Sequence, residues 1–174
     1  RFNELLVVKH IPKKTLMLQE GEVCNFEAYI NKGCTRTYYI DPKGVEITLQ
    51  FAIEDWWVSD IGSFHERKAS KLFIQTLEPS EVLLLPPKTK EKLLHETPKF
   101  ERVFRLMIKK NLPRLQDRFL QTVTTTAVEK YLDFIDRYPT IPQRVPQHYI
   151  ASYLGFSPEF LSKVRTRLSK GQDV

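Results

Sequence analysis

The sequence predicts an α+β protein in which an antiparallel barrel or roll of short strands precedes a helical C-terminal half. Two observations support this prediction. Residues 1–85 contain short β-branched and aromatic runs separated by turns, with no long helical pattern between them, which is typical of an antiparallel barrel or roll. From Pro87 onward the apolar residues recur at three- and four-residue steps, which is the period of a helix.

Each strand segment ends at residues that favour a turn. The clearest is a hairpin within 34–52, where two strand-forming runs flank Asp41-Pro42-Lys43-Gly44, a sequence with strong turn chemistry. Another run alternates apolar and polar residues before Gly33, as a half-buried strand does. The expected strand segments are 15–22, 25–33, 34–52 and 71–85, the last broken near Glu78-Pro79.

The helical half divides at prolines and threonines. The expected helices span 88–95, 100–112, 112–123 and 127–138. We expect Pro113 to kink or restart its helix because proline lacks the backbone N–H. We expect Thr124–Thr126 to form a hinge, since β-branched residues lower helix propensity, and the proline-rich stretch 139–146 to be a linker. In the expected helix 127–138, the inward-facing residues should be Val128, Tyr131, Leu132 and Ile135.

The run 145–168 predicts two short helices around a tight turn. Gly155 ends the first, where glycine adopts a left-handed backbone at little cost. Ser157 is a good N-cap for the second, and Pro158 occupies its first position. Its apolar side should be Leu161, Val164 and Leu168. A buried apolar face and a polar, basic outer face are typical of a DNA-recognition helix, although an ordinary helical hairpin has a similar pattern.

The segment 150–165, IASYLGFSPEFLSKVR, resembles the winged helix-turn-helix of the Crp/Fnr family of regulators. The order of elements is also similar to that family: a cyclic-nucleotide-binding-domain-like antiparallel β-roll (a double-stranded β-helix), a long dimer helix and a C-terminal winged helix-turn-helix. The resemblance implies a β-roll sensor domain at 1–98, a dimerisation helix and hinge at 99–126, and a DNA-binding domain at 127–174. The family's wing should follow Leu168, so we expect residues beyond both ends of this sequence.

The resemblance implies a homodimeric, sequence-specific transcriptional regulator that binds double-stranded DNA, with RNA polymerase as a candidate partner. Lys163 matches the family's central recognition arginine and is the expected principal base reader. The residues expected to contact DNA are Ser157, Pro158, Glu159, Ser162, Lys163, Arg165, Arg167 and Lys170. The expected dimer interface is Leu112, Leu115, Phe119 and Val123, a stripe whose alternative role is packing on the chain's own roll.

The family's phosphate-binding cassette resembles residues 57–71, with substitutions at its key positions. The resemblance implies a degenerate ligand pocket at four positions: Ser59 stands where the family has a glycine, Asp60 where it has a glutamate, Ser70 where it has an arginine and Lys71 where it has a serine. A cyclic phosphate pairs bidentately with a guanidinium, and a lysine lacks that planar fork. We therefore expect that cyclic AMP is not the effector, and that another small effector or none occupies the pocket. Nearby, Arg67 and Lys68 are expected to be solvated, and Trp56 and Trp57 either line the pocket or pack the roll.

Composition narrows the remaining function classes. The net charge of +6 and pI near 9.3 favour an anionic partner. Apolar runs fall short of the ~20 residues that span a bilayer, and a signal peptide is not visible, so we expect a cytoplasmic protein without a membrane partner.

Residues typical of enzymes are not arranged for catalysis or metal binding. The histidines His10, His65, His95 and His148 are scattered, unlike the clustered ligands of a metal-dependent cupin. With no nucleophilic triad or P-loop pattern, we expect neither an enzyme nor a cofactor. Cys24 and Cys34 should be free thiols, because a cytosolic regulator rarely forms disulfides. The alternative function is a ligand-binding signalling module that acts through protein contacts without DNA.

Overall fold

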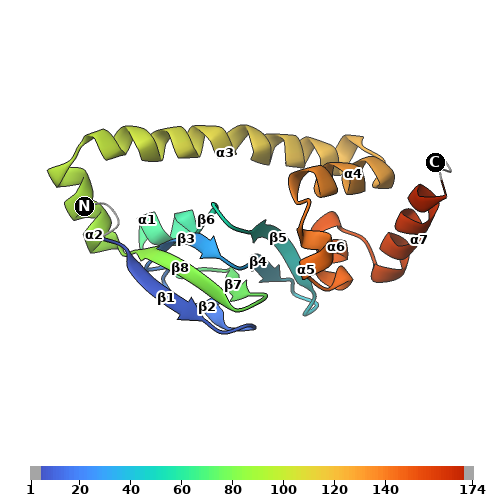
Figure 1. Cartoon of the computed structure of the whole chain (residues 1–174), viewed down its shortest axis with the longest axis horizontal. Coiled ribbons are helices and arrows are strands. Elements are labelled where there is room, and N and C mark those ends of the chain that lie inside the picture. The colour runs from blue at the N-terminus through green and yellow to red at the C-terminus, as the bar shows by residue number, and fades with distance from the viewer. Residues whose placement is uncertain (1–4, 171–174) are drawn as a thin grey trace. The chain divides into compact units, whose positions relative to one another are not determined.

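The computed structural model describes residues 5–170, apart from the side chains at 107, 110–112, 114, 115, 118 and 121–123. The chain forms two compact units, residues 1–96 and 97–174 (Figure 1). Most of the regular secondary structure of the first unit is β-strand, whereas that of the second unit is helical. No helix in the described part of the chain is long and apolar enough to cross a membrane.

The first unit is a roll of two four-stranded antiparallel sheets. One sheet has the strand order β1-β8-β3-β6 and the other β2-β7-β4-β5. The strands are β1 Val7–Ile11, β2 Leu16–Leu18, β3 Glu27–Lys32, β4 Thr35–Ile40, β5 Glu46–Ala52, β6 Trp57–Val58, β7 Phe73–Thr76 and β8 Ser80–Leu85. The predicted α+β class and antiparallel strands are confirmed, whereas β1 and the two-residue β6 had no recognised sequence signal.

The core of the roll follows from the alternation of β3. Ala28 and Ile30 are fully buried, and they lie on the same face because alternate residues of a strand point the same way. They join a cluster that includes Cys24, Phe26 and Ile74. Cys24 and Cys34 are both buried thiols, as expected.

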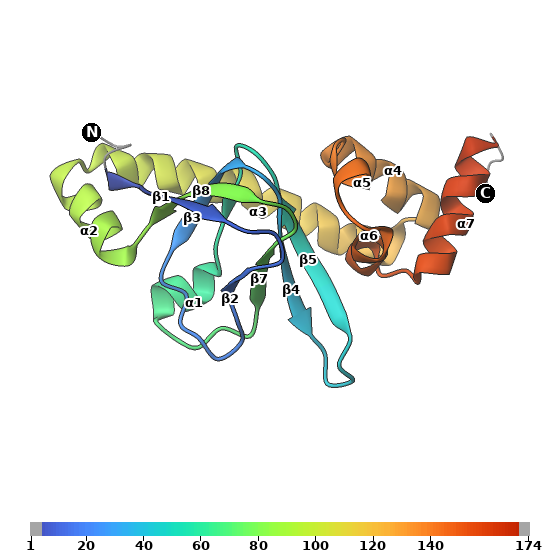
Figure 2. The same cartoon turned by 60° about the horizontal axis from the view of Figure 1, so that its bottom comes forward.

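The β4–β5 hairpin has the predicted turn. The Asp41 carboxylate accepts the backbone N–H groups of Lys43 at 2.8 Å and Val45 at 2.9 Å. Gly44 has φ +81°, a left-handed conformation that glycine adopts without strain. These local bonds set the hairpin's tip, which projects from the rest of the roll in Figure 2.

Two helices accompany the strands of the first unit. α1 (Ile61–Glu66) joins β6 to the segment before β7, and it was not predicted. α2 (Pro87–Glu96) follows β8, close to its expected bounds. The buried Lys90 of α2 pairs with Glu27 of β3 at 2.7 Å, and its ammonium lies 5.2 Å from the centre of the Phe64 ring. This ion pair connects α2 to the roll.

α3 (Lys99–Thr124) runs unbroken through Pro113. The expected restart there is therefore wrong. Proline removes one backbone hydrogen bond, and the helical turns on both sides continue without it. The helix ends at the threonine run, where Thr126 caps the next helix. That boundary agrees with the sequence, while hinge motion at Thr124–Thr126 stays a prediction.

α4 (Ala127–Arg137) begins with a capping box in which Thr126 and Glu129 bond each other's backbone N–H groups. Its inward face differs from the expected one. Leu132 is 44% exposed, whereas Phe134, absent from the prediction, is almost completely buried. The aromatic rings of Phe134, Tyr138 and Tyr153 lie 5.3–5.7 Å apart. This cluster turns the buried face of α4 away from Leu132.

The expected proline-rich linker is instead a packed segment. α5 (Ile141–Arg144) occupies its middle, and both Ile141 and Val145 are buried. Pro142 lies in the first turn of α5, where its missing N–H has no helical partner to lose. α6 (Gln147–Leu154) and α7 (Pro158–Ser169) follow. The wing expected after Leu168 falls outside the described residues.

Candidate nucleic-acid interface and ligand cassette

α6 and α7 are two short helices on either side of a tight turn, as the sequence predicts. Gly155 ends α6 with φ +74°, and the next backbone N–H, from Phe156, bonds the carbonyl of Ala151 at 2.8 Å. The Ser157 hydroxyl then accepts the backbone N–H of Phe160 at 3.2 Å and caps α7. The glycine and serine signals are confirmed, because both depend on the conformation of only a few adjacent residues.

α7 buries one face and exposes the other. Leu161 is fully buried and Val164 nearly so, and α7 packs through contacts with α6 and α4. Leu168 is only half-buried, which corrects its expected place in the core. Of the predicted DNA-contacting residues, Arg165 is half-buried, and the exposed ones are Ser157, Pro158, Glu159, Ser162, Lys163, Arg167 and Lys170.

The Glu159 carboxylate is held at the start of α7. Its own backbone N–H, followed by the Ser157 side chain, lowers the pKa of Glu159 by stabilising the ionised form. An ionised carboxylate accepts hydrogen bonds and donates none.

Phe160 was missed in the sequence interpretation. Its ring is 44% exposed and makes an edge-to-face contact with Phe156 at 5.2 Å between centroids. The available signal was position: Phe160 precedes the buried Leu161 and is three residues before Lys163. The outer face of α7 therefore includes a large aromatic group beside its polar and basic side chains.

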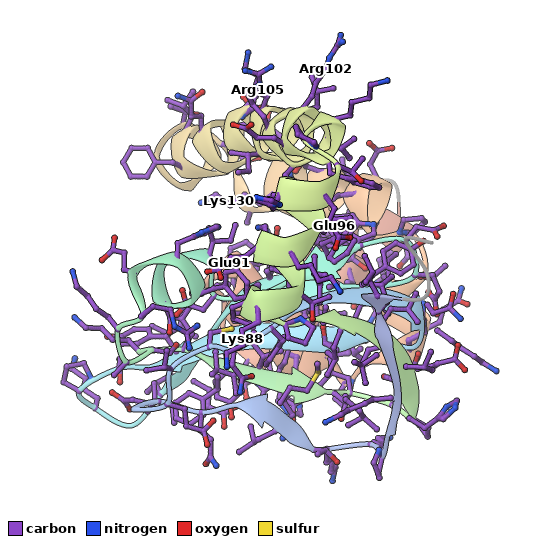
Figure 3. All side chains as sticks on the ribbon, turned by 90° about the vertical axis from the view of Figure 1, so that its left-hand side faces the viewer. Lys88, Glu91, Glu96, Arg102, Arg105 and Lys130 are labelled. Carbon is purple, nitrogen blue, oxygen red and sulfur yellow. The ribbon has the colours of Figure 1, made fainter. Side chains whose placement is uncertain are left out.

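Positive charge is concentrated on α3 more than on α7. α3 has seven basic and two acidic residues, a formal net charge of +5, whereas α7 has three and one, or +2. Arg102, Arg105 and Lys109 are exposed, and Figure 3 shows Arg102 and Arg105 directed outward from α3. Net charge by itself therefore does not distinguish α7 from α3 as a surface for an anionic partner.

The predicted dimer stripe is described at only one position. Phe119 is 71% exposed. The side chains of Leu112, Leu115 and Val123 lie outside the described residues. Elsewhere on α3, large apolar side chains are also exposed at Val103, Leu106, Ile108 and Leu120.

In the ligand cassette, two of the substituted residues bond each other. Asp60 caps α1 by accepting the backbone N–H of Ser63 at 3.1 Å through Oδ1. Its other oxygen, Oδ2, accepts the hydroxyl of the buried Ser70 at 2.7 Å. The residues at the family's glutamate and arginine positions thus meet, as a hydrogen-bonded pair that joins α1 to the segment before β7.

Ser59 and Lys71, the other predicted pocket residues, have different environments. The Ser59 hydroxyl donates to the carbonyl of Phe26 at 2.9 Å, whereas Lys71 is exposed. Arg67 is exposed, as expected, and it also donates to the carbonyls of Cys24 at 2.9 Å and Phe64 at 3.4 Å. The Arg67 guanidinium is therefore bonded to one backbone carbonyl before β3 and one in α1.

The two tryptophans pack at the roll. Trp56 lies against the roll's core, and Trp57 meets Tyr29 edge to face at 5.5 Å between centroids. These contacts favour the packing role over a pocket lining. Within residues 5–170, no group of three or more His, Cys, Asp or Glu side chains is arranged to hold a metal ion.

Comparison with known proteins finds similarity in structure and not in sequence. No protein-family model matches the chain, and a search of curated proteins finds no match. Among solved structures, the chain is similar to FixK2 from Bradyrhizobium japonicum, with TM-score 0.81 and 18% identity over 95% of this chain and 85% of that one. It is also similar to the c-di-GMP-responsive global regulator CLP from Xanthomonas campestris, with TM-score 0.77 and 14% identity over 98% and 89%.

A third structure connects this fold to a family by name. A Crp/Fnr-family transcriptional regulator from Eubacterium rectale has TM-score 0.71 and 16% identity over 95% of this chain and 80% of that chain. The fold of the chain is thus similar, over nearly its whole length, to that of Crp/Fnr-family regulators.

Proposed function

We propose that this chain is a sequence-specific, DNA-binding transcriptional regulator of the Crp/Fnr type that acts as a homodimer in the cytoplasm. The observation that carries the proposal is the α6–turn–α7 arrangement, in which a capped helix presents Glu159, Ser162 and Lys163 to solvent. A recognition helix enters the major groove with its N-terminal residues toward the bases. We propose no catalytic role.

The exposed groups of α7 match the chemistry of base edges. Lys163 donates to O6 or N7 of guanine, and the ionised Glu159 accepts from N4 of cytosine. Ser162 either donates or accepts. Arg165, Arg167 and Lys170 contact phosphates, which adds affinity without sequence information.

The homodimer places two such helices on successive turns of DNA. Half-sites one helical turn apart, about 34 Å, suit a two-fold symmetric pair of recognition helices. Phe119, exposed on α3, supports an interface along that helix. The same interface would include Leu112, Leu115 and Val123, which the sequence places on its face.

Cyclic AMP is not the effector of this regulator. The Ser70 hydroxyl occupies the family's arginine position and is already bonded to Asp60. A bound cyclic phosphate would have no guanidinium to pair with bidentately. It would instead lie near the Asp60 carboxylate, whose Oδ2 is bonded to Ser70 and not to a sugar hydroxyl. The roll responds to a different small molecule or acts as a scaffold. Calorimetric titration tests this: cyclic AMP binding at micromolar affinity or tighter would contradict it.

DNA selection tests the central proposal. Duplexes enriched from a random pool by the wild-type chain should share a two-fold symmetric sequence. Lys163→Ala should weaken binding to the enriched site by about 1–3 kcal/mol and relax base preference at one position of each half-site. Lys9→Ala, an exposed lysine in β1 of the roll, is the matched control and should bind like wild type. If no sequence is enriched while the folded chain still self-associates, a signalling module without DNA binding is the better description.

A further inference from the structure

Phe160 is a large apolar side chain on the solvent-facing part of a polar helix. It is the third residue of α7, and 44% of it is exposed. The buried side of α7 is already occupied by Leu161 and Val164. The exposed part of the ring is thus surplus to the core that these two residues form.

The ring lies in line with the basic side chains of α7. Residues three, four and seven apart fall on the same side of a helix. Phe160, Lys163 and Arg167 meet this spacing, and all three are exposed. Phe160 occupies the N-terminal end of that row, where a recognition helix comes closest to the bases.

Contacts within the turn hold Phe160 in place. Its backbone N–H bonds the Ser157 hydroxyl at 3.2 Å. Its ring meets the half-buried Phe156 at an interplanar angle of 84°. An aromatic side chain that is already positioned loses little conformational freedom when it makes a contact.

We propose that Phe160 is a specificity-determining residue that contacts the 5-methyl group of a thymine beside the base pair read by Lys163. The inference rests on the proposed function and deepens it. Thymine is the only base that displays an apolar group in the major groove, and phenylalanine is among the side chains that recognise it. Phe160 thereby selects thymine next to a position selected through hydrogen bonds.

Removal of single methyl groups from DNA tests the contact directly. In the duplex enriched by the wild-type chain, each thymine is replaced in turn by deoxyuridine, which lacks only the methyl group. At one position per half-site the wild type should lose about fourfold in affinity, the factor expected from burial of one methyl group. Phe160→Ala should bind thymine and deoxyuridine duplexes equally at that position, whereas Phe160→Leu should keep part of the difference.

Two controls separate this contact from general damage. Lys163→Ala should bind more weakly overall but retain the methyl effect, because it leaves the ring in place. Circular dichroism and thermal unfolding should show that Phe160→Ala folds like wild type. If a site is enriched but Phe160→Ala retains every thymine–deoxyuridine difference, this inference is overturned while the proposed function stands. If no site is enriched, the proposed function fails and the inference falls with it.

Discussion

Removal of the Asp60 side chain should destabilise the roll even in the absence of any ligand. Asp60 caps α1 through the backbone N–H of Ser63 and accepts the hydroxyl of Ser70. Loss of an N-cap costs about 0.5–2 kcal/mol, and loss of a hydrogen bond to a charged group about 1.5–3 kcal/mol. Since the two effects share one carboxylate, Asp60→Ala should lower the free energy of unfolding by about 2–4 kcal/mol.

Scanning calorimetry of the full chain measures this loss. For a domain of up to ~100 residues, each kcal/mol shifts the melting temperature by about 4–8 °C, so the transition of the roll should fall by about 10 °C or more. Asp60→Asn keeps an oxygen that caps a helix and should lose less. Glu66→Gln, in an exposed pair with Lys68 at 2.8 Å, is the matched control and should change little.

The calorimetric result discriminates between two roles for Asp60. A residue kept for ligand binding contributes little to the unliganded fold, and its removal leaves the melting temperature almost unchanged. If Asp60→Ala lowers the melting temperature by less than about 2 °C, the conclusion that the Asp60–Ser70 pair stabilises the fold is refuted. A large shift, with no cyclic AMP binding by the wild type, would support it.

Three further predictions concern association, salt and pH. Phe119→Asp should yield monomers in sedimentation and weaken operator binding, because a monomer loses its second half-site; dimers that persist would place the interface elsewhere. Arg167→Gln should weaken binding to cognate and random DNA alike and should lower the slope of log affinity against log salt concentration by about one unit. Arg102→Gln should change neither, because position 102 is about 33 Å along α3 from its C-terminal end, a distance well beyond the Debye length. The Thr126 backbone N–H and then its hydroxyl lower the pKa of Glu129. A carboxylate whose pKa is lowered in the folded state stabilises the fold at pH values above its ordinary pKa, and this stabilisation is lost as the pH falls through the folded-state pKa. The stability of α4 should therefore decrease below about pH 4. Glu129→Gln should remove that part of the acid dependence measured by circular dichroism.

Local signals in the sequence predicted the candidate DNA interface. Gly155, Ser157 and Pro158 set the end of α6 and the start of α7 through bonds that span only a few residues. The Asp41–Gly44 turn of the hairpin was predictable for the same reason. Each such signal depends on the conformational freedom of one residue and its immediate neighbours, so the rest of the fold changes it little.

Contacts distant in the sequence account for what was missed. The Asp60–Ser70 hydrogen bond joins residues ten positions apart, and neither residue type predicts the other as its partner. Leu132 has the helical period of a core residue, yet the packing of Phe134 on Tyr153 turns another face of α4 inward. Phenylalanine is a residue type that is usually buried. Phe160 is exposed because the neighbouring helices cover another face of α7. The sequence by itself predicted the Asp41–Gly44 turn, the ends of α6 and α7 at Gly155 and Ser157, and most of the longer strands and helices. Tertiary packing decided which faces are buried and which polar groups meet, because burial depends on neighbours that the local chain does not encode.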